Sequence, residues 1–117
     1  MASDTRRPNS PPSNPLGSTL RVGTVITCRR NDGARKPAYV LDVDLGPHGR
    51  RTSSAQLTGT YRPEDLVGRR VVVATSLGSR LIAGVRSEVL VLGATREDGG
   101  VSIVTIDDDV PDGSLVH

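Results

Sequence analysis

The chain of 117 residues has the length of one domain, and 35% of its residues are apolar. It contains no Phe or Trp and only two Tyr, so its core must consist of Val, Leu, Ile and Ala, which favours β-strands. The sequence lacks a run of about 20 apolar residues and a signal-like N-terminus, and its single Cys28 excludes an internal disulfide, so we expect a cytoplasmic protein.

The net charge of +2 conceals an uneven distribution. Between Thr19 and Arg96 there are 13 basic and 6 acidic residues, whereas residues 97–117 hold 6 acids and no Lys or Arg. All basic residues except Lys36 are Arg, whose planar guanidinium binds phosphates and carboxylates at two points. The body of the chain thus suits anionic partners, although a compositional bias towards Arg explains the same pattern.

Residues 1–18 are rich in Pro, Ser and Asn and show no apolar periodicity. Such a segment cannot bury enough apolar surface to offset the entropy lost on ordering, so we predict a disordered arm followed by one domain over residues 19–117. Residues 20–28 predict a first strand, in which Gly23 indicates a bulge or a sharp bend. Turn-forming residues 31–33 end this strand, and a basic loop leads to the next.

Residues 39–45 show a clean period of two. The inward set is expected to be Tyr39, Leu41, Val43 and Leu45. They alternate with Val40, Asp42 and Asp44, and the two aspartates should point outward. A turn at residues 46–49 and a returning strand over residues 50–56 complete the predicted hairpin.

Residues 63–68 predict a short helix, because Pro opens it, acids occupy its first turn and Gly closes it. Strands are predicted over residues 69–75 and 101–106, and a polar tail over residues 107–117. The run 87–93 is apolar on both faces after Glu88, so we expect it to be the covered central strand. Short strands with one helix before the fourth predict an all-β, OB-type five-stranded Greek-key barrel; a β-sandwich is the alternative.

The residues for catalysis are lacking. Only two His and one Cys are present, with no Gly-x-Ser-x-Gly run, so a nucleophile, base and orienting group cannot be assembled, and zinc lacks ligands. Asp42 and Asp44 share a strand face about 7 Å apart, but nothing nearby in the sequence supplies further ligands for a cation. We therefore predict a binding protein without a cofactor rather than an enzyme.

Basic and polar side chains in loops and at strand ends are the candidate binding residues. The loops after strands one and four border the usual ligand face of an OB fold, so Arg35, Lys36 and Arg80 are the first candidates for phosphate contacts. The other arginines serve equally well as solubilising charges, and the hydroxyl and amide groups suit RNA or a peptide backbone. The full set expected to contact nucleic acid is Arg35, Lys36, Arg80, Arg86, Ser87, Arg50, Arg51, Ser53, Ser54 and Gln56.

The only aromatic residues are Tyr39 and Tyr61, and Tyr39 falls on the inward face. This pattern argues against base-by-base stacking and favours contact with folded RNA through its shape and backbone. Polypeptide binding would instead use apolar side chains near loops, for which core or dimer packing is the alternative role: Leu77, Leu81, Ile82 and Val85. The thin core also predicts a homodimer, in which the acidic tail either pairs with the partner's basic body or is simply solvated.

Five runs together resemble the stand-alone tRNA-binding-domain family, and within it the CsaA branch of export-related chaperones. The runs are residues 21–25 (RVGTV), 36–39 (KPAY), 53–56 (SSAQ), 61–68 (YRPEDLVG) and 83–93 (AGVRSEVLVLG). The resemblance covers about residues 20–117. Residues 76–80 depart from the family pattern, because they lack the usual Asn and Pro, but they retain a basic residue in Arg80.

The resemblance implies an OB fold, a homodimer and binding of tRNA by shape rather than sequence. For the CsaA branch it also implies affinity for unfolded or exported polypeptides, and relatives occur as appended domains on methionyl- and phenylalanyl-tRNA synthetases. The Val-Leu pair after Ser87 and Glu88, where the tRNA-binding branch usually carries Gly-Met, is the CsaA form. Binding of tRNA is the leading hypothesis, and a polypeptide chaperone or a protein-interaction scaffold is the alternative.

Overall fold

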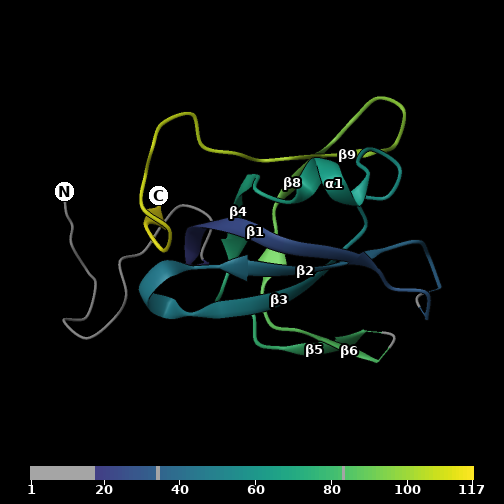
Figure 1. Cartoon of the computed structure of the whole chain (residues 1–117), viewed down its shortest axis with the longest axis horizontal. Coiled ribbons are helices and arrows are strands. Elements are labelled where there is room, and N and C mark those ends of the chain that lie inside the picture. The colour runs from purple at the N-terminus through teal and green to yellow at the C-terminus, as the bar shows by residue number, and fades with distance from the viewer. Residues whose placement is uncertain (1–17, 34, 83) are drawn as a thin grey trace.

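The structure, a computed structural model, describes residues 18–33, 35–82 and 84–117, so that most of the predicted arm lies outside the described residues. Its core is an antiparallel sheet in the order β3-β2-β1-β4-β7, with β10 added beside β1 (Figure 1). The elements of this sheet and its helix are β1 (Leu20–Arg30), β2 (Tyr39–Asp44), β3 (Arg50–Ala55), α1 (Pro63–Leu66), β4 (Arg70–Ala74), β7 (Leu90–Val91) and β10 (Leu115–Val116).

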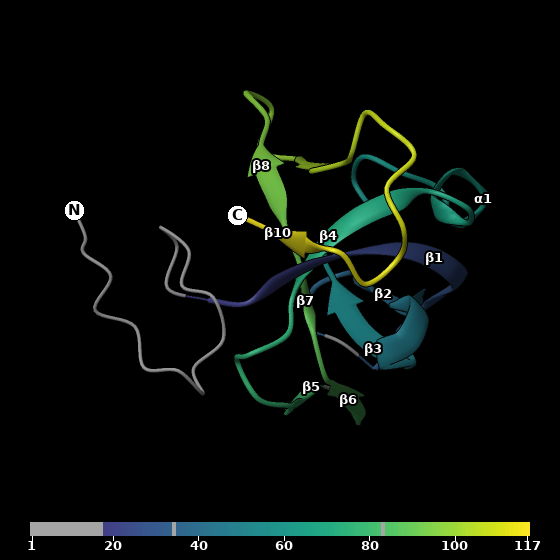
Figure 2. The same cartoon turned by 90° about the vertical axis from the view of Figure 1, so that its left-hand side faces the viewer.

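Two small hairpins extend from the sheet on opposite sides (Figure 2). One consists of β5 (Arg80–Ile82) and β6 (Val85–Ser87), and the other of β8 (Gly93–Thr95) and β9 (Val101–Ile103). The sheet curls until β3 meets the segment between β6 and β7, where the amides of Glu88 and Val89 donate to the Thr52 carbonyl at 2.7 and 3.4 Å. The result is a nearly closed five-stranded barrel with one helix between β3 and β4, which confirms the predicted OB-type fold.

The long strand β1 lies at the centre of this barrel, because it pairs with both β2 and β4. The predicted bulge at Gly23 is wrong in position, since the register shift occurs between Val25 and Thr27. Gly23 serves close packing instead. A Cβ atom there would lie 2.5 Å from Val43 Cγ1 and 2.8 Å from Leu45 Cδ2, so a larger residue would push β2 away.

The inward face of β2 forms the main core, as its alternation predicts. Tyr39, Leu41 and Val43 are each at most 1% exposed, and they pack with buried residues of β1, β4 and α1. Val40, on the other face of β2, is also 1% exposed. On the outward face the Asp42 carboxylate accepts hydrogen bonds from the hydroxyls of Thr27 and Thr52, at 2.7 and 3.0 Å.

The helix α1 is as short as predicted. Pro63 occupies its first turn, the Arg62 amide donates to the Asp65 carboxylate at 3.0 Å, and Gly68 ends the segment with φ of +88°. Leu66 is fully buried and anchors the helix against the core. Within the described part of the chain, no helix has the length and hydropathy that crossing a membrane requires.

The prediction of a covered central strand over residues 87–93 is wrong. This segment belongs to three short strands, Leu90 is 49% exposed, and β1 is the central strand instead. Along this segment the chain pairs with three different strands in turn. Glu88 and Val89 bond to β3, β7 pairs with β4, and Gly93 pairs with β9. A Cβ on Gly93 would lie 2.4 Å from Val101 Cγ1, so this last pairing has no room for a side chain.

The C-terminal segment packs on the chain's own barrel, which differs from both roles considered for the acidic tail. Asp112 forms an ion pair with Arg70 at 3.3 Å and accepts a hydrogen bond from Thr24 Oγ1 at 2.8 Å. Arg21 Nη1 donates to the Gly113 carbonyl at 2.8 Å, and β10 follows. The final predicted strand is shorter than expected, because β9 ends at Ile103 and the amide of Val104 turns to the Leu92 carbonyl.

Candidate functional site

Two basic segments lie at one end of the barrel, which we call the loop end. They are the β1–β2 loop, residues 31–38, and the β5–β6 hairpin, residues 80–87 (Figure 1). The strand register explains their proximity. Tyr39 at the start of β2 pairs with Ala55 at the end of β3, and β6 packs beside that part of β3. The structure therefore places the first candidates for phosphate binding at the same end of the barrel. They are Arg35 and Lys36 in the β1–β2 loop and Arg80 in the hairpin.

The β1–β2 loop is closed by local hydrogen bonds. The Asn31 amide donates to the Ala38 carbonyl at 3.0 Å, and the Gly33 amide donates to Asn31 Oδ1 at 3.2 Å. Arg35 and Lys36 are exposed in the part of the loop between these bonds. The loop thus presents two cations on a short, internally bonded turn.

The sequence analysis missed two arginines beside this loop. Arg29 and Arg30 are exposed at the end of β1, and the Arg30 guanidinium lies 5.9 Å from the ring centroid of Tyr39. Their adjacency at the end of a predicted strand, next to a basic loop, was the available signal. They extend the basic surface of the loop end along β1.

The β5–β6 hairpin presents different chemistry on its two faces. Cross-strand partners share a face, so Arg80 lies with Ser87 on one side and Leu81 with Arg86 on the other. Leu81 is 68% exposed, and Arg86 Nη1 donates to Ser79 Oγ at 3.1 Å. Arg80 and Arg86 therefore serve different surfaces, although the sequence analysis grouped them.

The serines of β3 and β6 hold the barrel closed. Ser87 Oγ accepts a hydrogen bond from the Ser54 amide at 3.0 Å and donates to the Val89 carbonyl at 3.2 Å. Ser53 is completely buried, which corrects the expectation that its hydroxyl meets a ligand, because its short side chain faces the core opposite Leu41. Gln56 is exposed just beyond β3.

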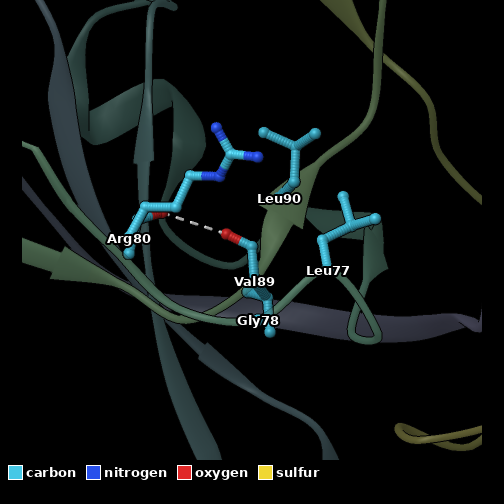
Figure 3. A pocket seen from close by; sticks show the side chains of 6 residues that line it. Leu77, Gly78, Arg80, Val89 and Leu90 are labelled. Atoms are coloured by element: carbon cyan, nitrogen blue, oxygen red, sulfur yellow. Dashed lines mark hydrogen bonds between the residues drawn. The ribbon is translucent and has the colours of Figure 1, made fainter.

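An apolar pocket of about 360 Å³ lies between the hairpin and β7. Figure 3 shows Leu77 and Leu90 facing each other across it, with the Arg80 side chain beside Leu90. The pocket is lined by Leu77, Gly78, Arg80, Ser87, Val89 and Leu90. Of the four apolar residues expected to bind polypeptide, Leu77 lines this pocket, whereas Leu81 and Val85 do not, and the side chain of Ile82 lies outside the described residues.

Arg50 and Arg51 lie far from the loop end. They pair with Asp44 and Val43 at the opposite end of the β2–β3 hairpin, so about five residues of strand, roughly 17 Å, separate them from Ala55. The six cations predicted to contact nucleic acid therefore occupy two ends of the barrel. Only the register of β3 reveals this separation.

The surroundings of Cys28 and Tyr61 shift the pKa of both side chains. Burial, aided by the negative charge of Glu64, raises the pKa of the Cys28 thiol from 9.0 to about 11, so this thiol stays protonated and unreactive. Burial also tends to raise the pKa of Tyr61, but its bonds to the Ile103 amide and Ser102 outweigh this and lower it. Within the described residues, no group of three His, Cys, Asp or Glu side chains is placed to hold a metal ion.

Comparison with known families matches this geometry to one domain type. The family model described as "Putative tRNA binding domain" matches residues 20–115. Among curated proteins, methionine–tRNA ligase of Methanocaldococcus jannaschii is 39% identical over 98 residues, which cover 84% of this chain and 15% of the ligase. The corresponding ligase of Clostridium tetani is 38% identical over 99 residues, with 84% and 15% covered. The chain thus spans only a small part of these relatives.

Solved structures of similar length are also matched. The chaperone CsaA of Bacillus anthracis str. Ames superposes with a TM-score of 0.81 and 39% identity, covering 87% of this chain and 93% of that chain. The CsaA chaperone protein of Picrophilus torridus gives a TM-score of 0.81 and 34% identity, covering 87% and 94%. Barrel, helix and C-terminal segment are therefore shared with proteins of the same size.

Proposed function

We propose that this chain, which belongs to the tRNA-binding-domain family, binds tRNA through phosphate contacts at the loop end of the barrel. The proposal rests chiefly on the exposed cations there, none of which forms an ion pair with another described residue. Cations that are not neutralised by an acid of the same chain are available to displace the counterions of a nucleic acid. These residues are Arg29, Arg30, Arg35, Lys36, Arg80 and Arg86.

The tyrosines support recognition of the RNA backbone rather than of its bases. Tyr39 is 1% exposed, and its hydroxyl donates to the Tyr61 carbonyl at 2.8 Å. Tyr61 is half-buried, accepts a hydrogen bond from the Ile103 amide and lies 5.8 Å from the Arg69 guanidinium. Neither ring offers a free face for a base, so binding depends on charge and shape.

Titration with tRNA at increasing salt tests this proposal. We expect the logarithm of the association constant to fall linearly with the logarithm of salt concentration. The double variant R35Q/K36Q should reduce the slope by about 1 for each phosphate that it no longer neutralises. Arg96→Gln, which changes an exposed arginine on the β8–β9 turn that pairs with Asp98, is the matched control and should leave the slope unchanged. Binding that ignores salt, or an equal effect of the control, would contradict the proposal.

A polypeptide chaperone is the second candidate, favoured by the apolar pocket beside the hairpin and by the similarity to CsaA chaperones. Leu77 and Leu90 are 52% and 49% exposed, which gives an unfolded segment an apolar surface to bind. We expect suppression of client aggregation to weaken in Leu77→Ser but to survive in R35Q/K36Q. Equal loss of aggregation suppression in both variants would show that one surface serves both ligands.

We further propose that the protein acts as a homodimer and is not itself catalytic. A small outer cluster, Leu20, Val72 and Ala74, is buried against Leu92, Ile106 and Val116. Leu90, which pairs with Ala74 and so lies on the same face, is 49% exposed. A two-fold partner would remove this apolar surface from water. Light scattering should therefore give twice the chain mass at micromolar concentration, and a monomer would refute the dimer.

A further inference from the structure

A second cavity lies at the other end of the barrel, which we call the tail end because the C-terminal segment packs there beside the β2–β3 turn (Figure 1). It has a volume of about 260 Å³ and is mainly polar. The residues that line it are Arg21, Leu45, His48, Arg51, Thr75, Glu88 and Val89. The segment 87–90 separates this cavity from the apolar pocket, and Val89 lines both.

Two arginines of this tail-end pocket come from the inward face of the barrel. Arg21 pairs with Val73 and Arg51 pairs with Val43, and both valines are fully buried core residues. Cross-strand partners share a face, so each arginine occupies a position where the barrel normally carries an apolar side chain. Both residues are half-buried as a result. Partial burial of a cation costs free energy that an anion at the same site would offset.

The polar groups of the tail-end pocket leave most of their donors available. Arg21 Nη1 donates to the Gly113 carbonyl and Arg51 Nη1 to the Arg50 carbonyl, but each guanidinium carries five N–H groups. Neither arginine forms an ion pair with an acid in the described part of the chain. The acid that lines the pocket, Glu88, accepts a hydrogen bond from the Thr52 amide at 3.0 Å.

We propose that the tail-end pocket binds a phosphate group, supplied by a phosphodiester of the bound RNA. This inference rests on the proposed tRNA binding, because it adds a second contact region to the same ligand. Two arginines and Glu88 give the pocket a net charge of +1 with His48 neutral, which matches the single charge of a phosphodiester. The planar guanidinium groups suit two-point binding of phosphate oxygens, and the Thr75 hydroxyl and His48 ring add polar groups.

The neighbouring residues Arg50 and Arg51 provide a matched pair of variants. Arg51 lines the pocket, whereas Arg50 is exposed on the opposite face of β3 and does not. For Arg51→Gln we expect the salt slope of tRNA binding to fall by about 1, which is about an eightfold loss of affinity at 0.1 M salt. Arg50→Gln should lower both the slope and the affinity clearly less than Arg51→Gln does. Arg51→Lys retains the charge and should recover most of the slope, and it replaces the Gln variant if that one does not fold.

A titration with inorganic phosphate, followed by NMR of the His48 ring, separates this inference from the proposed function. Saturable changes in the His48 resonances of wild type that vanish in Arg51→Gln support the phosphate site. If wild type shows these changes but does not bind tRNA, the phosphate site stands and only RNA is excluded as the source of the phosphate. Equal effects of the Arg50 and Arg51 variants on tRNA binding, or no phosphate shifts, overturn the inference. If Arg51→Gln loses binding to an acidic peptide but keeps its binding to phosphate and tRNA, the inference is also overturned, in favour of a carboxylate ligand.

Discussion

Strands β1 to β4 and the segment after them, residues 76–106, complete one barrel by different means. The pairs β1–β2, β1–β4 and β2–β3 each contain five or six residue pairs. In the later segment β7 pairs with β4 through only two residues, and isolated backbone hydrogen bonds and single side chains make the other connections. Ser87 and Glu88 accept hydrogen bonds from β3 amides, and Tyr61 Oη accepts one from the Ile103 amide.

Because of this difference, we expect β1 to β4 to determine mainly the stability of the fold and residues 76–106 to contribute mainly to ligand binding. The four-stranded part gains its free energy from a buried apolar face, whereas the later segment depends on individual polar contacts, each worth about 1 kcal/mol. Both pockets are bounded by residues 87–90 of the later segment, and the basic hairpin belongs to it. Substitutions there should change ligand binding at a modest cost in stability, and substitutions of the buried apolar residues of β1 to β4 should do the reverse.

The largest effect is expected for Leu41→Ala. Leu41 is fully buried in the main core, and its truncation should reduce the free energy of unfolding by about 3 kcal/mol, which lowers Tm by roughly 15 °C. Leu81→Ala, at a 68% exposed position of the hairpin, should change stability by less than about 0.5 kcal/mol. Urea unfolding of both variants measures the contrast, and comparable losses would remove the distinction between the two regions.

The rate at which the Cys28 thiol is alkylated gives a second measure of how firmly the four-stranded part stays closed. Its pKa is raised from 9.0 to about 11 by burial and by Glu64, so near pH 8 its thiolate fraction is about a hundredfold lower than in the unfolded chain. Alkylation by iodoacetamide should be slower by about that factor in buffer than in concentrated urea. A folded protein that reacts as fast as the unfolded chain would show that β1 opens readily at this position.

The two regions also differ in how far the sequence predicts them. The strands β1 to β4 follow from alternating apolar residues and turn chemistry, and α1 from Pro63 and Gly68. The run 87–93 misled because Val89 and Val91 pack on the main core, but Leu90 lines a pocket and Leu92 packs on the outer cluster rather than under a covering layer. The basic loops are visible in the sequence, but the inward placement of Arg21 and Arg51 depends on strand register, which the sequence pattern alone does not specify.

A smaller loss of stability is expected for Ser87→Ala. This change removes the acceptor of the Ser54 amide and the donor to the Val89 carbonyl, at a cost of about 1–2 kcal/mol. Because residues 87–90 bound both pockets, binding of ligands should weaken as well. Ser79→Ala, at an exposed hydroxyl that accepts from Arg86, is the control, and an equal loss of stability there would show that the closure does not depend on Ser87.

The smallest effect is expected at α1, which lies between β3 and β4 in the first region. The hydrogen bond from the Arg62 amide, followed by that from its side chain, holds the pKa of Asp65 below its usual 3.8. Because the folded state favours the ionised form, this stabilisation is present above pH 3.8 and is lost as the pH falls through the lowered pKa. Asp65→Asn should therefore be slightly less stable than wild type at pH 6, and the difference should shrink steadily in acid. A difference that does not change with pH would mean that the charge of Asp65 contributes nothing and that only the shape of its side chain supports the helix.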